Sequence, residues 1–160
     1  MTAALVTSSP AGAQEIGEAR PIENNSGPGA SVRPGAYFPS RGDMGLSVDA
    51  NATYGIPAEP FVIAPGARFA GYFGGNGAVT GMPVVEAMLP VGPLVPYLKA
   101  GLGIGHANGP RETSAALMGG LGLDVHISRE VLLGADATWE TVAATGFSTL
   151  AIGPRVGIRY

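Results

Sequence analysis

The feature that most constrains the fold of this chain is a strict alternation of apolar and polar residues. It is clearest in the segment Leu46-Ser47-Val48-Asp49-Ala50-Asn51-Ala52-Thr53-Tyr54. Side chains repeat every two residues on a strand, so the alternation predicts strands with one apolar and one polar face. Similar segments bounded by turn residues predict eight strands, over residues 32–39, 44–55, 60–73, 79–91, 94–106, 113–127, 131–141 and 147–160. All connections are of hairpin length, which predicts an antiparallel meander.

The composition indicates that the apolar faces are not buried in an ordinary soluble core. Of the 160 residues, 46% are apolar and only 13% are charged, whereas about a quarter of an average soluble domain is charged. No apolar run approaches the roughly 20 residues of a membrane-spanning helix, because Gly, Pro or a charged residue interrupts each one. The chain is therefore expected to be a membrane protein that spans the bilayer with strands.

Several functional classes are disfavoured by the same data. A net charge of −3 and nine scattered Lys and Arg residues argue against a nucleic-acid partner. The absence of cysteine removes thiolate metal sites and cysteine nucleophiles. The segment Gly101-Leu102-Gly103-Ile104-Gly105 resembles half of a nucleotide-binding fingerprint but precedes no helix, and His106 has no second imidazole nearby. We expect no cofactor and no metal.

The first 30 residues differ in composition from the rest. Residues 1–13 are small and apolar and end in Ala11-Gly12-Ala13, which is similar to a signal-peptidase site. We interpret them as the remnant of a truncated signal peptide, with a disordered tail as the alternative. Residues 14–30 are polar and rich in turn-forming residues, so they are expected to form a flexible periplasmic linker. The barrel domain is expected over residues 31–160.

The charged residues after residue 30 lie either in connections or on one face of their strand. Strand by strand, that face carries Arg33, Asp49, Arg68, Glu86, Lys99, Asp124, Asp136 with Glu140, and Arg155 with Arg159. The sign alternates over the first six strands. Because Arg68 lies on the strand between those of Asp49 and Glu86, we expect it to pair with one or both. The residues between these charges are mostly Gly, Ser, Thr, Asn and Met.

Two inside-out structures fit this pattern: a soluble, lipocalin-like barrel with an apolar lumen that binds lipid, or a membrane barrel with a polar lumen. A face exposed to water would carry more Lys and Glu than about one charge per strand among glycines. An eight-stranded lumen is only wide enough for side chains to fill it, so small residues beside paired charges suit its interior. The pattern therefore favours an all-β, eight-stranded, antiparallel up-and-down transmembrane β-barrel.

Aromatic residues on the apolar face lie near strand ends: Phe38, Tyr54, Phe61, Phe73, Trp139 and Tyr160. Girdles of aromatic residues at the two membrane interfaces are typical of transmembrane barrels. The alternative is that these positions reflect only the strand propensity of aromatic residues. Pro65, Pro83 and Pro154 fall inside strands and predict bulges or local breaks.

Three segments give the chain a resemblance to the family of small bacterial outer-membrane β-barrel proteins. They are Arg33-Pro34-Gly35-Ala36-Tyr37-Phe38-Pro39, Pro96-Tyr97-Leu98-Lys99-Ala100-Gly101-Leu102-Gly103-Ile104-Gly105 and Val156-Gly157-Ile158-Arg159-Tyr160. The resemblance implies Tyr160 as the terminal signal for the barrel-assembly machinery and both termini in the periplasm. It also implies that the connections around residues 42, 76, 109 and 145 lie outside the cell.

A catalytic function is not expected. His126, Ser128 and Glu140 supply the residue types of a hydrolase triad, but Glu140 is predicted at the opposite end of the following strand, beyond hydrogen-bond reach. We therefore expect an integral outer-membrane barrel with a polar lumen filled by side chains and a structural or surface-organising role. The alternatives are a narrow channel for water or small ions and the soluble lipid-binding barrel.

Overall fold

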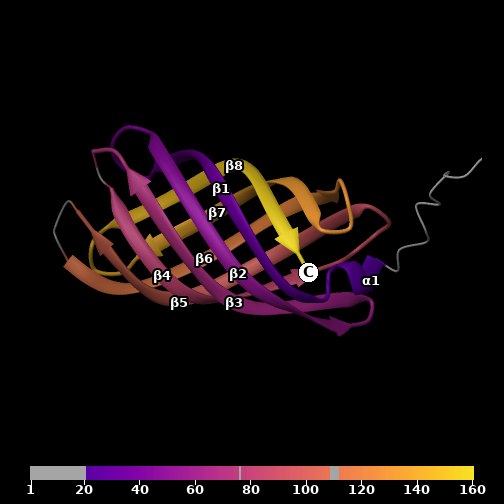
Figure 1. Cartoon of the computed structure of the whole chain (residues 1–160). Helices are drawn as coiled ribbons and strands as arrows, with labels where there is room; N and C mark the ends of the chain where they lie inside the picture. Colours follow the sequence, from indigo (N-terminus) through magenta and orange to yellow (C-terminus); the bar gives the residue numbers. More distant parts are fainter. Residues whose placement is uncertain (1–20, 76, 109–111) are drawn as a thin grey trace, which may run out of the picture.

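Eight antiparallel strands form a single sheet that closes on itself as a barrel (Figure 1). The structure is a computed structural model that describes residues 21–75, 77–108 and 112–160. A short helix, α1 (Pro21–Asn24), precedes the barrel. The strands are β1 (Gly27–Pro39), β2 (Gly45–Ala58), β3 (Phe61–Phe73), β4 (Ala78–Met88), β5 (Leu94–Ala107), β6 (Glu112–His126), β7 (Val131–Val142) and β8 (Phe147–Arg159). No helix in these ranges is long and apolar enough to cross a bilayer.

The strands pair in sequence order, and β8 pairs with β1, which confirms the predicted up-and-down topology. Strand β1 begins before the prediction because Gly27 to Ala30 pair with Gly55 to Ala52 of β2. The described part of the predicted linker, residues 21–30, thus holds α1 and the start of β1. Strand β4 ends at Met88 rather than at residue 91, and Val91 instead forms an isolated bridge with Leu94 in the next connection.

The strands are strongly staggered around the barrel. A path from partner to partner around all eight strands runs through Gly29, Thr53, Gly66, Val84, Gly101, Met118, Glu140, Thr149 and Pro39. The path leaves β1 at Gly29 and returns to it at Pro39, so the shear of the barrel is ten residues. Such a stagger tilts the strands by about 35–45° from the barrel axis, and it brings distant parts of the sequence to the same height.

The prolines interrupt the pairing locally without changing the register. Around Pro65, the β2–β3 pairing stops after Thr53 and Gly66 and resumes at Ile56 and Ile63 in the same register. Pro83 interrupts the β4–β5 pairing in the same way. Pro154 lies in a longer interruption of the β1–β8 pairing. The expected local breaks are present, but the expected bulges are not, because an outward proline removes a backbone donor without adding a residue.

The barrel has a polar inner face and an apolar outer face. Buried residues alternate with more exposed ones along the strands, most regularly in β2, β4 and β8. Large apolar residues on the outside include Leu46, Phe69, Leu98, Leu102, Ile104 and Leu121. The soluble lipocalin-like alternative requires the reverse arrangement. We call the end where β1 begins and β8 ends the terminal end, and the other the distal end.

Candidate functional site: the lumen of the barrel

The lumen contains a balanced set of buried charges. Within the described residues, ten charged side chains are at most 5% exposed. Five are basic and five are acidic: Arg33, Arg68, Lys99, Arg155 and Arg159, and Asp49, Glu86, Asp124, Asp136 and Glu140. All nine residues predicted for the charge lattice are in this set, together with Arg159. A poorly solvated interior penalises unpaired charge, so equal numbers are what a filled lumen requires.

Arg68 is at the centre of the distal half of this network. Its Nε donates to Asp49 Oδ2 at 2.5 Å, and its Nη1 donates to Glu140 Oε2 at 2.6 Å. The hydroxyl of Tyr72 lies 3.2 Å from Arg68 Nη2 and donates to the same Glu140 oxygen at 2.5 Å. Arg68 therefore links two carboxylates that come from β2 and from β7 on the opposite wall.

Asp136 connects this group to the next one. Arg33 Nη2 donates to Asp49 at 3.2 Å, and Arg33 Nε lies 3.2 Å from Asp136. Lys99 Nζ is 2.7 Å from Asp136, and the Tyr97 hydroxyl donates to the same carboxylate at 2.8 Å. Asp136 thus contacts three polar side chains from β1 and β5.

Arg155 forms the third group, nearer the terminal end. Its Nη2 donates to Glu86 at 3.1 Å, and its Nε lies 3.6 Å from Asp124. The guanidinium of Arg155 is 4.5 Å from the centre of the Tyr97 ring. The hydroxyl of the same tyrosine donates to Asp136. A continuous polar network therefore extends along the lumen from Tyr72 to Asp124.

Arg68 was expected to pair with Asp49, Glu86 or both, and it pairs with Asp49 alone of the two. Arg68 registers with Met82 on β4, and Glu86 lies four residues further toward the terminal end, a distance of about 13 Å at the usual strand rise. Glu86 pairs with Arg155 instead. The stagger of the strands, which cannot be read from the order of charges along the chain, decides these partners.

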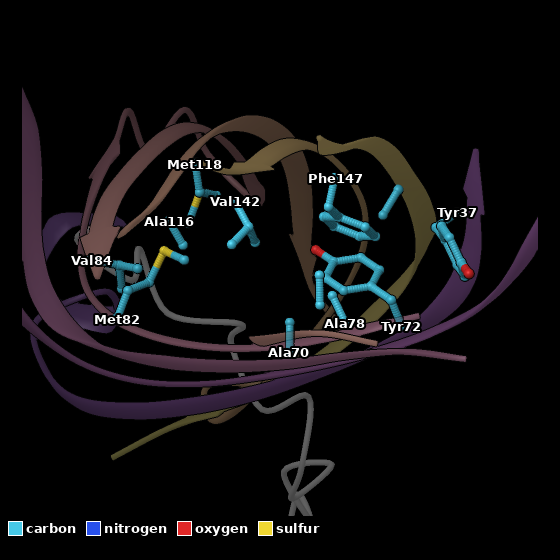
Figure 2. Close-up of a cluster of buried hydrophobic side chains, with 12 residues drawn as sticks. Tyr37, Ala70, Tyr72, Ala78, Met82, Val84, Ala116, Met118, Val142 and Phe147 are labelled. Atoms are coloured by element: carbon cyan, nitrogen blue, oxygen red, sulfur yellow. The ribbon is translucent and has the colours of Figure 1, made fainter. Parts of the chain in front are cut away.

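Two apolar layers enclose the network. The distal layer contains Tyr37, Ala70, Tyr72, Ala78, Met82, Val84, Ala107, Ala116, Met118, Val142, Phe147 and Ala151. Figure 2 shows most of these side chains directed into the barrel, with Tyr72 beside Phe147. The terminal layer contains Val62, Ala64, Met88, Val95 and Tyr97, and Ile22 of α1 packs against it. The joined charges therefore lie between two clusters of apolar side chains, and Arg159 lies beside the terminal cluster, where it bonds the sulfur of Met88.

The aromatic residues of the predicted girdle lie on the outer surface in two groups. Phe38, Phe73 and Trp139 lie in the distal halves of their strands. Tyr54, Phe61 and the predicted assembly signal Tyr160 lie at the terminal end. Phe61 and Phe73 begin and end the 13-residue strand β3, so they are separated by about 30 Å along the axis. This separation is close to the thickness of a bilayer's hydrocarbon core.

The structure does not bring His126, Ser128 and Glu140 together. His126 registers with Leu132 of β7, and Glu140 lies eight residues beyond Leu132, about 26 Å along the strand. The Ser128 hydroxyl accepts the backbone N–H groups of Glu130 and Val131 in the connecting turn. In the described part of the chain, no group of His, Cys, Asp and Glu has an arrangement suited to a metal ion.

Tyr72, Tyr97 and Asn25 are among the contributors to the lumen that were not predicted as site residues. The tyrosines follow the alternation, because Tyr72 lies four residues after Arg68 and Tyr97 two residues before Lys99 on the same inward face. Their position was therefore available from the sequence. Asn25 carried no such signal, because it precedes the first strand.

No protein-family model and no curated protein sequence matches the chain, whereas solved structures do. Neisserial surface protein A is 17% identical with a TM-score of 0.58, over 83% of this chain and 96% of that one. The attachment invasion locus protein Ail of Yersinia pestis is 12% identical with a TM-score of 0.59, over 84% and 99%. The outer membrane enzyme PagL is 14% identical with a TM-score of 0.57, over 82% and 99%. At these identities the likeness concerns the fold, and it confirms the predicted resemblance to small outer-membrane barrels.

The comparison with PagL corrects the expectation that the chain is not an enzyme. PagL is described as an outer membrane enzyme and has the same fold, so an eight-stranded barrel of this kind is compatible with catalysis. The separation of His126 from Glu140 argues only against a catalytic triad of His126, Ser128 and Glu140. The general expectation of a non-enzymatic protein is therefore withdrawn.

Proposed function

We propose that this protein is an integral outer-membrane β-barrel whose lumen is closed by its own side chains, and that its role is structural or surface-organising. The observation that carries the proposal is the set of five buried acidic and five buried basic side chains, nine of which are joined by ion pairs, together with the two apolar layers. In a barrel of eight strands, side chains suffice to fill the interior. The apolar outer surface is a suitable contact for lipid. The barrel-assembly machinery is the partner proposed for biogenesis, with Tyr160 as its signal.

Conductance measurement tests the closed lumen. Protein purified in detergent and inserted into planar bilayers is expected to give no current steps above the protein-free background. Insertion is checked by the heat-dependent gel mobility of the same protein in vesicles. A stable open current from folded protein would contradict the closed lumen and support a narrow channel. One observation favours that second candidate: among the described residues, the buried polar atoms Ser31 Oγ, Ser47 Oγ, Thr80 Oγ1 and Glu86 Oε1 have no hydrogen-bond partner.

Fractionation of cells that express the chain tests the location. We expect the protein in the outer-membrane fraction, extracted only with detergent, because its outward residues would otherwise expose a continuous apolar surface to water. Recovery from a soluble periplasmic fraction would contradict the membrane assignment.

Single-cysteine labelling tests the proposed orientation, since the chain has no native cysteine. Probes at Leu102→Cys and Val48→Cys, both on the outer face, are expected to be quenched by quenchers carried in the lipid tails. Ala143→Cys, in the exposed distal turn, is expected to react with an impermeant reagent on intact cells. The neighbouring Gly146 is a poorer site because its φ is +70°. Free reaction of Leu102→Cys in intact vesicles would reverse the assignment of the outer face.

A further inference from the structure

The short segment before β1 lies beside the terminal mouth of the lumen. Figure 1 shows α1 near the C-terminus at that end of the barrel. The helix makes a single turn, in which the backbone N–H groups of Asn25 and Ser26 donate to the carbonyls of Ile22 and Glu23. Gly27 then continues the chain into β1 with a φ of +87°, a left-handed conformation that glycine adopts without steric cost. The bend leaves residues 22–25, here called the plug segment, beside the mouth.

The contacts of the plug segment with the interior include those of Ile22 and Asn25. Ile22 packs against the terminal apolar layer of the lumen. Asn25 is fully buried; its backbone carbonyl oxygen accepts a hydrogen bond from Arg159 Nη1 at 3.2 Å, and its side-chain Nδ2 lies 3.1 Å from His126 Nε2. Asn25 therefore connects the segment to β8 and to the end of β6.

The apolar layer against which Ile22 packs is unsuited to contact with water. Val62 and Val95 are completely buried and carry no polar side-chain atom. Arg159 donates to Asn25 and to the sulfur of Met88. Without the plug segment, the terminal layer would lose its contact with Ile22 and the Arg159 guanidinium its bond to Asn25, although neither contact is part of the pairing of the barrel strands.

We propose that the plug segment is a lid that closes the terminal mouth of the lumen and can leave it without unfolding the barrel. The proposal rests on the closed lumen proposed above. A lid at the terminal mouth controls access to the interior only if the rest of the lumen is already closed by side chains. Elements with few buried contacts open locally at a lower free energy than the whole structure. The plug segment lies outside the sheet, whereas each barrel strand is paired on both sides. Release of the segment would expose the terminal layer, of which Val95 is a member, while the distal layer stays closed.

Thiol labelling at two depths tests the lid in the full chain. Val95→Cys reports on the terminal layer and Val142→Cys on the distal layer; both valines are almost completely buried. Each is made alone and together with Ile22→Asp, and the rate of reaction with a small water-soluble maleimide is measured. Loss of one apolar contact is expected to raise the rate at Val95→Cys by roughly tenfold and to leave Val142→Cys unchanged. Ile127→Asp, at an exposed isoleucine of the same end, is the matched control and should change neither rate.

The outcomes separate the lid from the closed lumen. An unchanged rate at Val95→Cys, or an equal rise at both cysteines, would overturn the lid. A current from the parent protein in planar bilayers would instead overturn the closed lumen, whatever the labelling rates are. Heat-dependent mobility verifies that each variant is folded. If Ile22→Asp does not fold, Asn25→Ala removes the contact with His126 and is expected to raise the rate at Val95→Cys in the same selective manner.

Discussion

Replacing Arg68 with alanine is expected to lower the free energy of unfolding by about 3 to 5 kcal/mol, the usual cost of removing one partner of a buried ion pair. Arg68 is completely buried and bonds both Asp49 and Glu140, so the variant leaves two carboxylates with fewer partners. Reversible urea unfolding in lipid vesicles measures the change, with the single tryptophan, Trp139, as the fluorescent probe. Glu112→Gln, at an exposed carboxylate, is the control and should change stability by less than about 0.5 kcal/mol.

A second substitution identifies which carboxylate loses more of its hydrogen-bond partners when Arg68 is removed. Asp49 keeps bonds from Arg33 and Asn51 in the Arg68→Ala variant, whereas Glu140 keeps only the Tyr72 hydroxyl. Glu140→Gln should therefore recover part of the loss, because it neutralises the less supported charge. Glu86→Gln should not, since Glu86 pairs with Arg155. Additive effects for Arg68→Ala with Glu140→Gln would contradict the network.

Replacing Leu121 with arginine is expected to lower the free energy of unfolding by about 2 to 4 kcal/mol, the cost of a cation on the lipid face at mid-bilayer. Leu121 lies on the outer face, 59% exposed, and pairs with Leu98 and Ala137 of the neighbouring strands. A barrel dissolved in water would gain a solvated charge at this position and lose almost nothing. The same urea titration in vesicles measures the difference.

The depth dependence of this effect supplies its control. Leu94 begins β5 at the terminal end and also faces outward. Leu94→Arg is expected to cost about 0 to 1 kcal/mol, because a charge near the interface reaches water and headgroups. Equal costs at Leu121 and Leu94 would show that this surface is not embedded in lipid.

Local patterns in the sequence were sufficient for the strands and for the face on which each residue lies. The alternation around Asp49 needs only the two-residue period of a strand, which is a property of the backbone. Hairpin-length connections then allow only neighbours in sequence to pair. For this reason the number of strands, their order and the inward direction of Arg68 and Lys99 could all be predicted.

The partners of the inward charges could not be predicted in the same way. Arg68 and Glu140 are 72 residues apart in the sequence and come from opposite walls of the barrel. Their contact depends on the ten-residue shear, which accumulates over all eight pairings and is invisible in any single strand. A change of register in one pairing would have given Arg68 a different partner.

The plug segment shows the same division between local and tertiary information. Residues 22–25 belong to the polar, turn-rich stretch 14–30, which taken alone favours a flexible linker. Their position is decided by Ile22 against the terminal layer and by Asn25 against Arg159, contacts that exist only after β8 has closed the barrel. The sequence by itself therefore determined an eight-stranded barrel with a charged interior, because side-chain direction is local. Only the tertiary structure decided which charges meet and what covers the terminal mouth, because those contacts require the closed, staggered sheet.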